Sequence, residues 1–511
     1  MSRASVILRN VAANWVGFAV NGAVTLVLTP FVLAHLGSAR YGIWILSASV
    51  VGYYGLLDLG LRAGVTQYLT RYLAIGDLAK AGECMSAAVA ALATIGLMMV
   101  GLSIGAAYAV PHLFDLSPEL GRETFWCILI VGSSTGIQFA LQPYGSIFTA
   151  RQRFDLANLI GITTRLLTAA AVYVVLKAGY GLIGISAATC AVSCIDYLIR
   201  WRVATRLVPE LSIDPRRFNM QRLKEVSSFG LWNFLISINQ YVYQHVPNML
   251  IGFFMPVAAV GHYALAIGLV RQLNAVIGPI GAVMYPAAAA MDVQADRGGL
   301  TRLYHDGSRL MLLIMTPMVL IAAFWAEDFY RLWIGESYLR DGPFHSVALV
   351  FQILLISTVT NFSNIGSQIL LGAGHVRLVA TALLCGSALN LSASLILIGR
   401  YGLAGVAAAT VLASAVIDLM AMPILVQRVM GLPVKDFLHR ALLRPAGAAL
   451  LLLLAILAIR LLGEPKDWFN LALQCLLAGA AAAAVIANLG VTAAERQRFV
   501  GNPLRRLLQR A

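Results

Sequence analysis

Long apolar stretches follow one another along most of the chain, and short segments between them carry most of the charged residues. A helix needs about 20 apolar residues to cross a bilayer. We therefore predict an all-α polytopic membrane protein with about fourteen transmembrane helices. The predicted spans are 12–35, 41–62, 86–110, 123–146, 158–177, 181–199, 229–255, 259–285, 309–333, 345–371, 376–398, 402–426, 442–461 and 468–490. A membrane β-barrel would need short segments of alternating polarity, and these do not dominate.

One predicted span carries an unusual number of polar groups. Residues 232–254 read WNFLISINQYVYQHVPNMLIGFF, with several amides and no charged side chain. At about 100° per residue the amides share one face, which two ring side chains flank. This face consists of Asn233, Gln240, Gln244 and Asn248, flanked by Tyr241 and His245.

Similar polar stripes recur in three other spans. They consist of Asn14 and Asn21, of Ser134, Gln138 and Gln142, and of Ser357, Asn361, Asn364 and Gln368. Unsatisfied polar groups in hydrocarbon cost several kcal/mol, so each stripe must face protein or water. Hydrogen bonding between helices explains one or two amides in a helix. Four stripes favour a water-filled cavity that accepts a hydrophilic ligand such as a sugar.

A few charged residues fall inside the predicted spans. Arg271 lies near the middle of span 259–285, where an isolated charge is costly and therefore indicates a functional site or a buried pair. Arginine binds phosphates bidentately, so Arg271 is a candidate for gripping a diphosphate, and Arg165 is a second candidate. Asp58, Asp418 and His245 are candidates for ion coupling. Local pairing with an arginine four residues later is an alternative role for Asp58, as it is for Asp196.

Composition and charge narrow the class of protein. The chain is 59% hydrophobic and 12% charged, so it cannot cover itself with a solvated surface. Its net charge of +14 is explained by loop topology, because most Lys and Arg fall in alternate loops. This asymmetry places both termini in the cytoplasm. No basic soluble domain is visible, so nucleic-acid binding is not expected.

The first and second halves of the chain resemble each other. YGLIGISAAT at 180–189 matches YGLAGVAAAT at 401–410, and YGS at 144–146 matches IGS at 365–367 at the same offset. We predict two parallel six-helix repeats followed by two further helices. The predicted domains are the first bundle at 1–205, a cytoplasmic linker at 206–228, the second bundle at 229–430, and the last two helices with a basic tail at 431–511. Such repeats are typical of transporters.

The remaining features argue against an enzyme. Every predicted outer loop is short, so no extracytoplasmic domain surrounds a substrate. The segment FWAEDFYRLWIGESY at 324–338 reads as an aromatic anchor at the outer interface, with Glu327 and Arg331 paired one turn apart. No metal or cofactor is expected, because the cysteines have no nearby His or carboxylate cluster.

One stretch carries a family resemblance. Residues 35–77 contain Leu36-Gly37, Tyr41-Gly42 and the run LLDLGL at 56–61. This pattern resembles the N-terminal signature of bacterial polysaccharide exporters in the multidrug/oligosaccharidyl-lipid/polysaccharide (MOP) superfamily. YRLWIGESY at 330–338 and the two repeated YGL segments are also similar to that family.

The resemblance implies a Wzx-type flippase in the bacterial cytoplasmic membrane. Such proteins move undecaprenyl-diphosphate-linked oligosaccharides by alternating access, driven by a proton or sodium gradient or by the membrane potential. Expected partners are the lipid-linked oligosaccharide, membrane lipids and glycan-assembly proteins. Two other readings stay open: a MATE-like multidrug or cation antiporter, and a membrane enzyme that joins glycans. The short outer loops argue against the enzyme.

Overall fold

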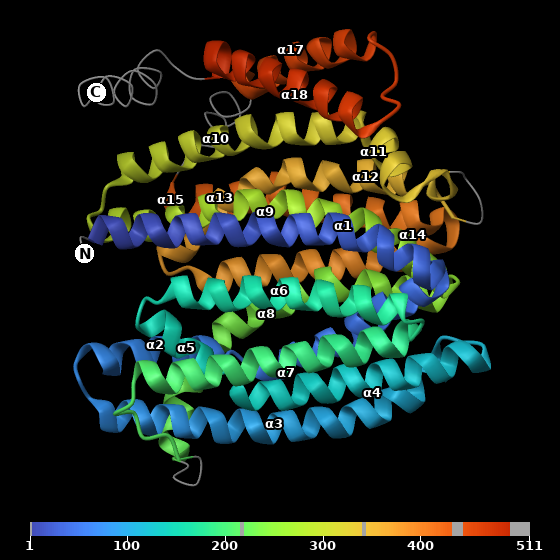
Figure 1. The fold of residues 1–511 in the computed structure, drawn as a ribbon. Coiled ribbons are helices and arrows are strands. Elements are labelled where there is room, and N and C mark those ends of the chain that lie inside the picture. Colours follow the sequence, from blue (N-terminus) through green and yellow to red (C-terminus); the bar gives the residue numbers. More distant parts are fainter. Residues whose placement is uncertain (1–2, 215–218, 340–343, 432–442, 491–511) are drawn as a thin grey trace, which may run out of the picture. The chain divides into compact units, whose positions relative to one another are not determined.

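The computed structural model describes the backbone of residues 3–214, 219–339, 344–431 and 443–490. Side chains are described there except at 3–14, 228–233, 277, 279–280, 282–283, 443–444 and 489–490. The described residues are helical and contain no strand (Figure 1). The chain forms two compact units, unit 1 at 1–264 and unit 2 at 265–511. The predicted all-α fold is therefore confirmed.

Unit 1 consists of the helices that cover the first seven predicted spans. They are α1 (Arg3–Gly52), η1 (Tyr53–Asp58), α2 (Leu61–Ala74), α3 (Leu78–Leu113), α4 (Pro118–Leu141), α5 (Tyr144–Ala150), α6 (Phe154–Lys177), α7 (Gly181–Leu207), α8 (Met220–Phe254) and the start of α9 (Val257–Val293). Gly37 interrupts α1 with a φ of 73°, which separates the first two spans. The polar helix α8 packs on α1, α2 and α3.

Unit 2 holds the rest of α9 and the remaining helices. They are α10 (Arg297–Phe324), α11 (Ala326–Ile334), η2 (Glu336–Tyr338), α12 (Val347–Thr360), η3 (Asn361–Ser363), α13 (Asn364–Gly372), α14 (Val376–Ala415), η4 (Val416–Ala421), α15 (Met422–Met430), α17 (Leu443–Arg460), α18 (Trp468–Val485) and η6 (Ile486–Gly490). Gly402 divides α14 between two predicted spans, as Gly37 divides α1. Helices α17 and α18 pack against each other (Figure 1).

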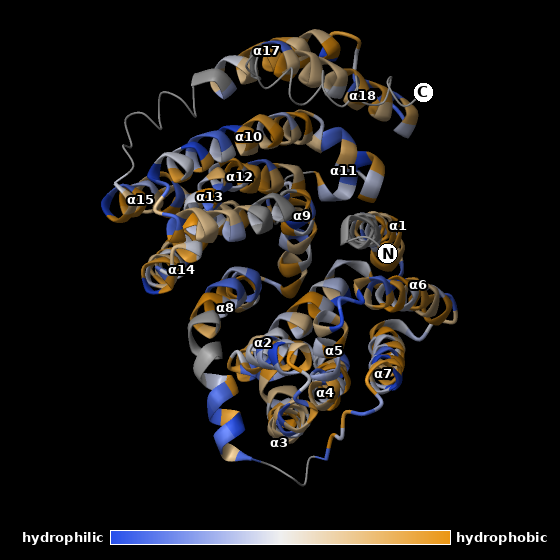
Figure 2. Ribbon diagram, turned by 90° about the vertical axis from the view of Figure 1, so that its left-hand side faces the viewer, coloured by the Kyte–Doolittle hydropathy of each residue, from blue (hydrophilic) through white to orange (hydrophobic). Residues whose placement is uncertain are grey.

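The described residues of the predicted spans are mostly helical, and spans 41–62, 123–146 and 345–371 each run over more than one helix. Among the described residues, 9 helical segments are long and apolar enough to cross a membrane by length and hydropathy. Figure 2 shows the same distribution, with hydrophobic residues along the helices and hydrophilic ones at the first turns of α8. The chain is therefore a multi-pass membrane protein. The placement of both termini in the cytoplasm stays a prediction.

The repeat is visible in the backbone of each half. Gly181 and Gly402 occupy matching positions in the two YGL segments, and both adopt a left-handed conformation, with φ of 57° and 51°. The fourth helix of each repeat is also broken at the same place, between α4 and α5 and at η3 between α12 and α13. The compact units divide at another point, because α8 packs in unit 1. The predicted domain boundaries stay a prediction.

Replacing Gly181 by alanine is expected to lower the free energy of unfolding by about 1 kcal/mol, because an L-residue is strained at this φ. A Cβ at Gly181 would meet no atom within 4 Å, so the cost comes from the backbone conformation and not from a steric clash. Gly145→Ala in helix α5 is the matched control, since it too has open space and no positive φ. Thermal unfolding in detergent compares them. Equal stability of the two variants would contradict the role of this φ.

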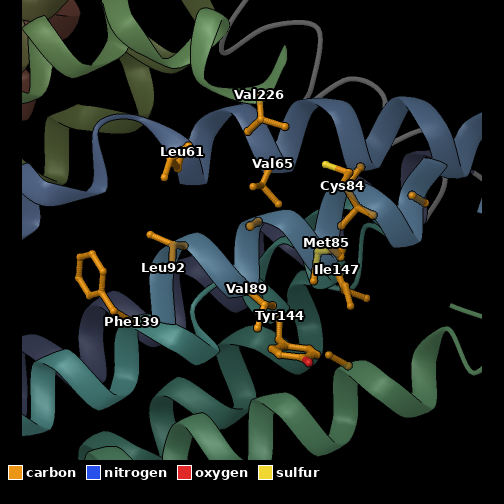
Figure 3. Close-up of a cluster of buried hydrophobic side chains, with 14 of the residues drawn as sticks. Leu61, Val65, Cys84, Met85, Val89, Leu92, Phe139, Tyr144, Ile147 and Val226 are labelled. Carbon is orange, nitrogen blue, oxygen red and sulfur yellow. The ribbon is translucent and has the colours of Figure 1, made fainter. Parts of the chain in front are cut away.

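Apolar side chains from α2, α3 and α5 form the main core of unit 1 (Figure 3). Val65, Leu69, Met85 and Leu92 are fully buried there. Val226 near the start of α8 belongs to the same cluster. This core fixes α2 and α8 around the segment that contains the LLDLGL signature.

A buried ion pair joins α11 to the last two helices. Asp328 on α11 is 2% exposed, and its Oδ2 lies 2.7 Å from Nη2 of Arg460 on α17. The Arg460 guanidinium lies 5.6 Å from the centre of the Trp325 ring. Trp325 Nε1 in turn donates to Oε1 of Gln474 on α18 at 2.7 Å. We call these four residues the α11 junction.

The neighbouring Arg331 does not have the partner predicted for it. It lies 3.4 Å from Asp328 and 3.7 Å from Glu464, in place of the predicted Glu327. The buried Asp328 is nearer in the folded helix because α11 turns its side chain toward α17. The predicted cluster of aromatic residues is present, with Phe329 packing on Trp333 and Trp468.

Candidate functional site

The LLDLGL signature forms a break in the second span. The 3₁₀ helix η1 ends at Asp58, and Leu59 and Gly60 are both left-handed, with φ of 49° and 76°. Helix α2 then begins at Leu61. The backbone N–H of Arg62 donates to Oδ1 of Asp58 at 3.3 Å, so this carboxylate receives an N–H from the first turn of α2. Ion coupling through Asp58 stays a prediction beside this structural contact.

Two ring side chains of α8 cover this break. A methyl group on Gly52 would overlap the imidazole of His245, and one on Gly55 would overlap the ring of Tyr241. Tyr53 lies 5.6 Å from His245 between ring centres. Glycines at these two positions therefore allow α8 to approach the broken helix. His245 is held in an aromatic contact, and its role in ion coupling stays a prediction.

The amides of α8 do not share one environment. Asn248 is 4% exposed, and its Nδ2 donates to Oγ of Ser49 on α1 at 2.9 Å. Gln240 and Gln244 are exposed. Asn248 thus forms a hydrogen bond between helices, whereas the cavity-lining role of the two exposed glutamines stays a prediction.

The predicted residues of α1 and α6 are placed as follows. Asn21 is exposed. Arg165 on α6 donates from Nη2 to Oγ1 of Thr25 on α1 at 3.0 Å, and its buried Nε has no hydrogen-bond partner among the described residues. Arg165 therefore faces α1. Asn14 and Asn233 lie outside the described side chains.

Unit 2 brings another part of the predicted site together on α9. Arg271 is exposed there, one helical turn before Asn274. Asn274 Oδ1 accepts a long hydrogen bond of 3.4 Å from Nδ2 of Asn361, and Asn274 Nδ2 reaches Oγ1 of Thr358 at 3.4 Å. The polar face of α12 and η3 therefore meets α9 beside Arg271.

Asn274 was missed by the sequence analysis. The sequence contains a signal for Asn274, because it is an amide three residues after Arg271 in the same predicted span. The other two predicted amides of this region, Asn364 and Gln368, contact each other at 3.3 Å within α13. They lie near Gly281 of α9, which has no side chain to cover them.

Asp418 lies on the π-helical turn η4. Oγ1 of Thr360, the last residue of α12, has two acceptors for its one proton: the Ser357 carbonyl at 2.9 Å and Asp418 Oδ2 at 3.3 Å. Within the described residues Asp418 has no ion pair. By contrast Asp196 on α7 is paired with Arg200 at 2.7 Å, as predicted, and accepts from Thr164 at 2.7 Å.

An ionic network ties the start of α8 to α2 and α3. Arg222 lies 2.9 Å from Glu83 and 2.9 Å from Glu225. The Tyr72 hydroxyl donates to Glu225 at 2.9 Å. Burial raises the pKa of the Glu225 carboxyl, but hydrogen bonds from Arg222 and Tyr72 outweigh it and hold that pKa below its ordinary value. The contribution of Glu225 to stability is thus present at neutral pH and is lost only as the pH falls through that lowered pKa.

These features define a multi-pass α-helical membrane protein with two repeated halves and broken helices that carry polar side chains. Broken helices of this kind hold ligand and ion sites in secondary transporters. The chain belongs to the polysaccharide biosynthesis protein family, whose model matches residues 84–341, half of the chain. The resemblance drawn from the LLDLGL signature is therefore confirmed.

Individual relatives agree with this assignment. The chain is 22% identical over 472 residues to EpsK, an uncharacterized membrane protein of Bacillus subtilis (strain 168), covering 90% of this chain and 91% of EpsK. A solved structure of the lipid II flippase MurJ, in an inward closed conformation, has a TM-score of 0.67 at 15% identity, over 92% of this chain and 98% of MurJ. An inward-facing multidrug resistance MATE transporter of the MOP superfamily has a TM-score of 0.65 at 15% identity, over 81% of this chain and 98% of that chain.

Proposed function

We propose that this protein is a flippase for undecaprenyl-diphosphate-linked oligosaccharides in the bacterial cytoplasmic membrane, acting in O-antigen, capsule or exopolysaccharide assembly. The observation that carries the proposal is Arg271, an exposed arginine in an apolar membrane helix one turn from Asn274. A guanidinium suits a diphosphate, and nearby amides suit a sugar. The family description, polysaccharide biosynthesis, supports a glycan as cargo.

In this proposal the protein moves its substrate by alternating access and makes no covalent bond. Transport is driven by a proton or sodium gradient or by the membrane potential. Both termini lie in the cytoplasm, where the basic segments contact anionic lipids or glycan-assembly proteins. Exposed Gln240, Gln244 and Asn21 are proposed to contact the hydrophilic part of the substrate.

A MATE-like antiporter is the second candidate. Its support is the fold, because the MATE transporter matches with a TM-score of 0.65, close to the 0.67 of the flippase. The fold does not separate the two functions, since both belong to one architecture. The family description favours the flippase.

Reconstitution into liposomes tests the two functions against each other. Purified protein would be incorporated with a fluorescent lipid-linked oligosaccharide, and a membrane-impermeant quencher would report how much of it crosses. A flippase is expected to move the glycolipid faster than empty liposomes do and to leave a cationic dye where it is. Transport of the dye alone would contradict the proposal and favour the antiporter.

Complementation in cells gives a second test. A bacterial strain that lacks its own polysaccharide flippase would express this protein at a verified membrane level. Restored surface glycan is expected if the glycan matches. Strains that make several different glycans should be compared, because the result depends on whether the sugar part of the lipid-linked oligosaccharide fits this protein.

A further inference from the structure

Two irregular helical segments of unit 2 contact each other. Helix α12 ends at Thr360, where η3 begins, and α14 ends in the π-helical turn η4. The segments η3 and η4 pack together, and the hydrogen bond between Thr360 and Asp418 joins them. A single π-helical turn inside an α-helix is rare and is frequent at functional sites. The contact therefore combines a carboxyl group with two places where a helix is broken.

Comparison of the two repeats shows that this polar contact belongs to the second half only. The offset that aligns the YGL segments also aligns Asp418 with Tyr197 and Thr360 with Phe139. Phe139 is buried in the apolar core of unit 1. Helix α7 is α-helical throughout at the matching place. The second repeat thus has a carboxyl and a hydroxyl where the first has the phenol of Tyr197, which bonds to Gln142, and the phenyl ring of Phe139.

The acid nearest to this position in the first repeat is neutralised. Asp196, one residue before Tyr197, is paired with Arg200 one turn later. In the second repeat the residue one turn after Asp418 is Met422, which carries no charge. A carboxylate at membrane depth without a cationic partner is costly, and a bound proton or cation removes that cost.

The surroundings of Asp418 contain few other charged groups. The elements packed against η4 are α14, α15 and η3, and α12 contributes Thr360. Their charged or titratable side chains are Arg377, Cys385, Arg400 and Tyr401 on α14 and Arg428 on α15. None of them forms an ion pair with Asp418 in the part of the chain that the structure describes.

The Asp418–Thr360 contact is connected to the proposed substrate site through neighbouring residues. Thr360 is followed by Asn361, which bonds to Asn274 on α9, one turn from Arg271. A change in the Asp418–Thr360 contact at the end of α12 therefore acts on the residue that holds α9. All of these residues lie in unit 2.

We propose that Asp418 is the proton-binding site that couples transport to a proton gradient. The proton binds to Oδ2 of Asp418, and the protonated acid donates to the Thr360 hydroxyl, which gives its own proton to the Ser357 carbonyl. Loss of the proton leaves a negative charge where η3 meets η4. This charge favours a change in the backbone conformation of η3 and η4. The direction of coupling rests on the flippase function proposed above, whereas proton binding itself does not.

Infrared difference spectroscopy tests proton binding without any substrate. Full-length protein in liposomes would be cycled between acidic and alkaline buffer, and the carbonyl band of a protonated carboxylic acid would be recorded. The chain has 23 Asp and Glu, so the difference between the wild-type and Asp418→Asn spectra is used, and it is expected to contain one carboxylic-acid component that only wild type shows. Thr360→Val keeps the carboxyl but removes its hydrogen bond, so the band should shift in frequency. Tyr197→Phe, at the matching position of the first repeat, is the control and should leave the band unchanged.

Translocation under a pH gradient tests coupling. In wild type a pH gradient is expected to stimulate translocation of the fluorescent lipid-linked oligosaccharide. In Asp418→Asn this stimulation is expected to be lost, while Tyr197→Phe keeps it. Should Asp418→Asn fail to fold, Thr360→Val supplies the test through its shifted band and altered pH dependence.

The outcomes separate this proposal from the proposed function. Identical carboxyl bands in wild type and Asp418→Asn, or a difference component that responds to sodium and not to pH, overturn proton binding at Asp418. A pH-gradient stimulation that persists in the variant overturns coupling through it. If the band behaves as expected but wild type moves no lipid-linked oligosaccharide, the flippase function fails and the proton site stands.

Discussion

Asp328→Ala is expected to destabilise unit 2 by about 3–5 kcal/mol, because it leaves a cation without its partner in a buried pair. The carboxylate is 2% exposed, and Arg460 lies 2.7 Å from it. The Arg460 guanidinium also donates to the carbonyl of Phe324 at 2.6 Å. Loss of the carboxylate therefore removes the charge that holds α17 at the α11 junction. Thermal unfolding in detergent measures the loss.

A surface ion pair provides the control for this change. Glu119 lies 2.6 Å from Arg40, and the two side chains are 67% and 36% exposed, while Arg40 keeps Glu123 at 2.8 Å as a second partner. Glu119→Ala should cost about 0–1 kcal/mol, as for other exposed pairs. Hydrogen exchange would also be compared, and α17 and α18 should exchange faster only in Asp328→Ala. Equal stability of the two variants would show that the α11 junction does not hold these helices.

Arg271→Ala is expected to reduce translocation of a lipid-linked oligosaccharide about 100-fold. Two charge-assisted hydrogen bonds to a diphosphate contribute about 3 kcal/mol together, and each 1.4 kcal/mol is a factor of ten. Arg271→Lys keeps the charge but loses the two-pronged geometry, so it should lie between the variant and wild type. The measurement is the quenching assay in liposomes, supported by surface glycan in complemented cells.

Arg302→Ala is the matched control for Arg271, since this arginine is also exposed but lies on α10. It should translocate at the wild-type rate. If Arg271→Ala also transports normally while wild type is active, the flippase function stands and Arg271 has a structural role. If only substrate binding weakens and the maximal rate is kept, Arg271 binds the substrate equally in every state.

The helices and the repeat were predictable because both leave strong signals in the sequence. Apolar length indicated the long helices, and two matched YGL segments predicted a duplication with which the positive φ of Gly181 and Gly402 agrees. Single residues were harder to place. Asn248 belongs to a polar stripe by periodicity, yet it is buried against Ser49, because periodicity does not tell which neighbour covers a face.

The contacts of unit 2 show a second limit of the sequence. Asp418 stood out as an acid in an apolar helix, but neither the π-helical turn nor its contact with Thr360 has a local signal. Both depend on how α12 and α14 pack. Likewise, Arg331 was assigned to Glu327, because spacing along a helix allows partners both three and four residues away and does not tell which one is used.

The signature LLDLGL has a consequence for how such sequences are classified. Leu59 and Gly60 form a left-handed turn in the backbone. The Asp58 carboxylate accepts a hydrogen bond from the backbone N–H of Arg62 in the first turn of α2. A pattern that specifies a corner in the backbone carries information on architecture and none on cargo. Genome surveys that rely on this run will therefore group proteins with unrelated glycans, and cargo should be assigned from residues such as those beside Arg271 on α9.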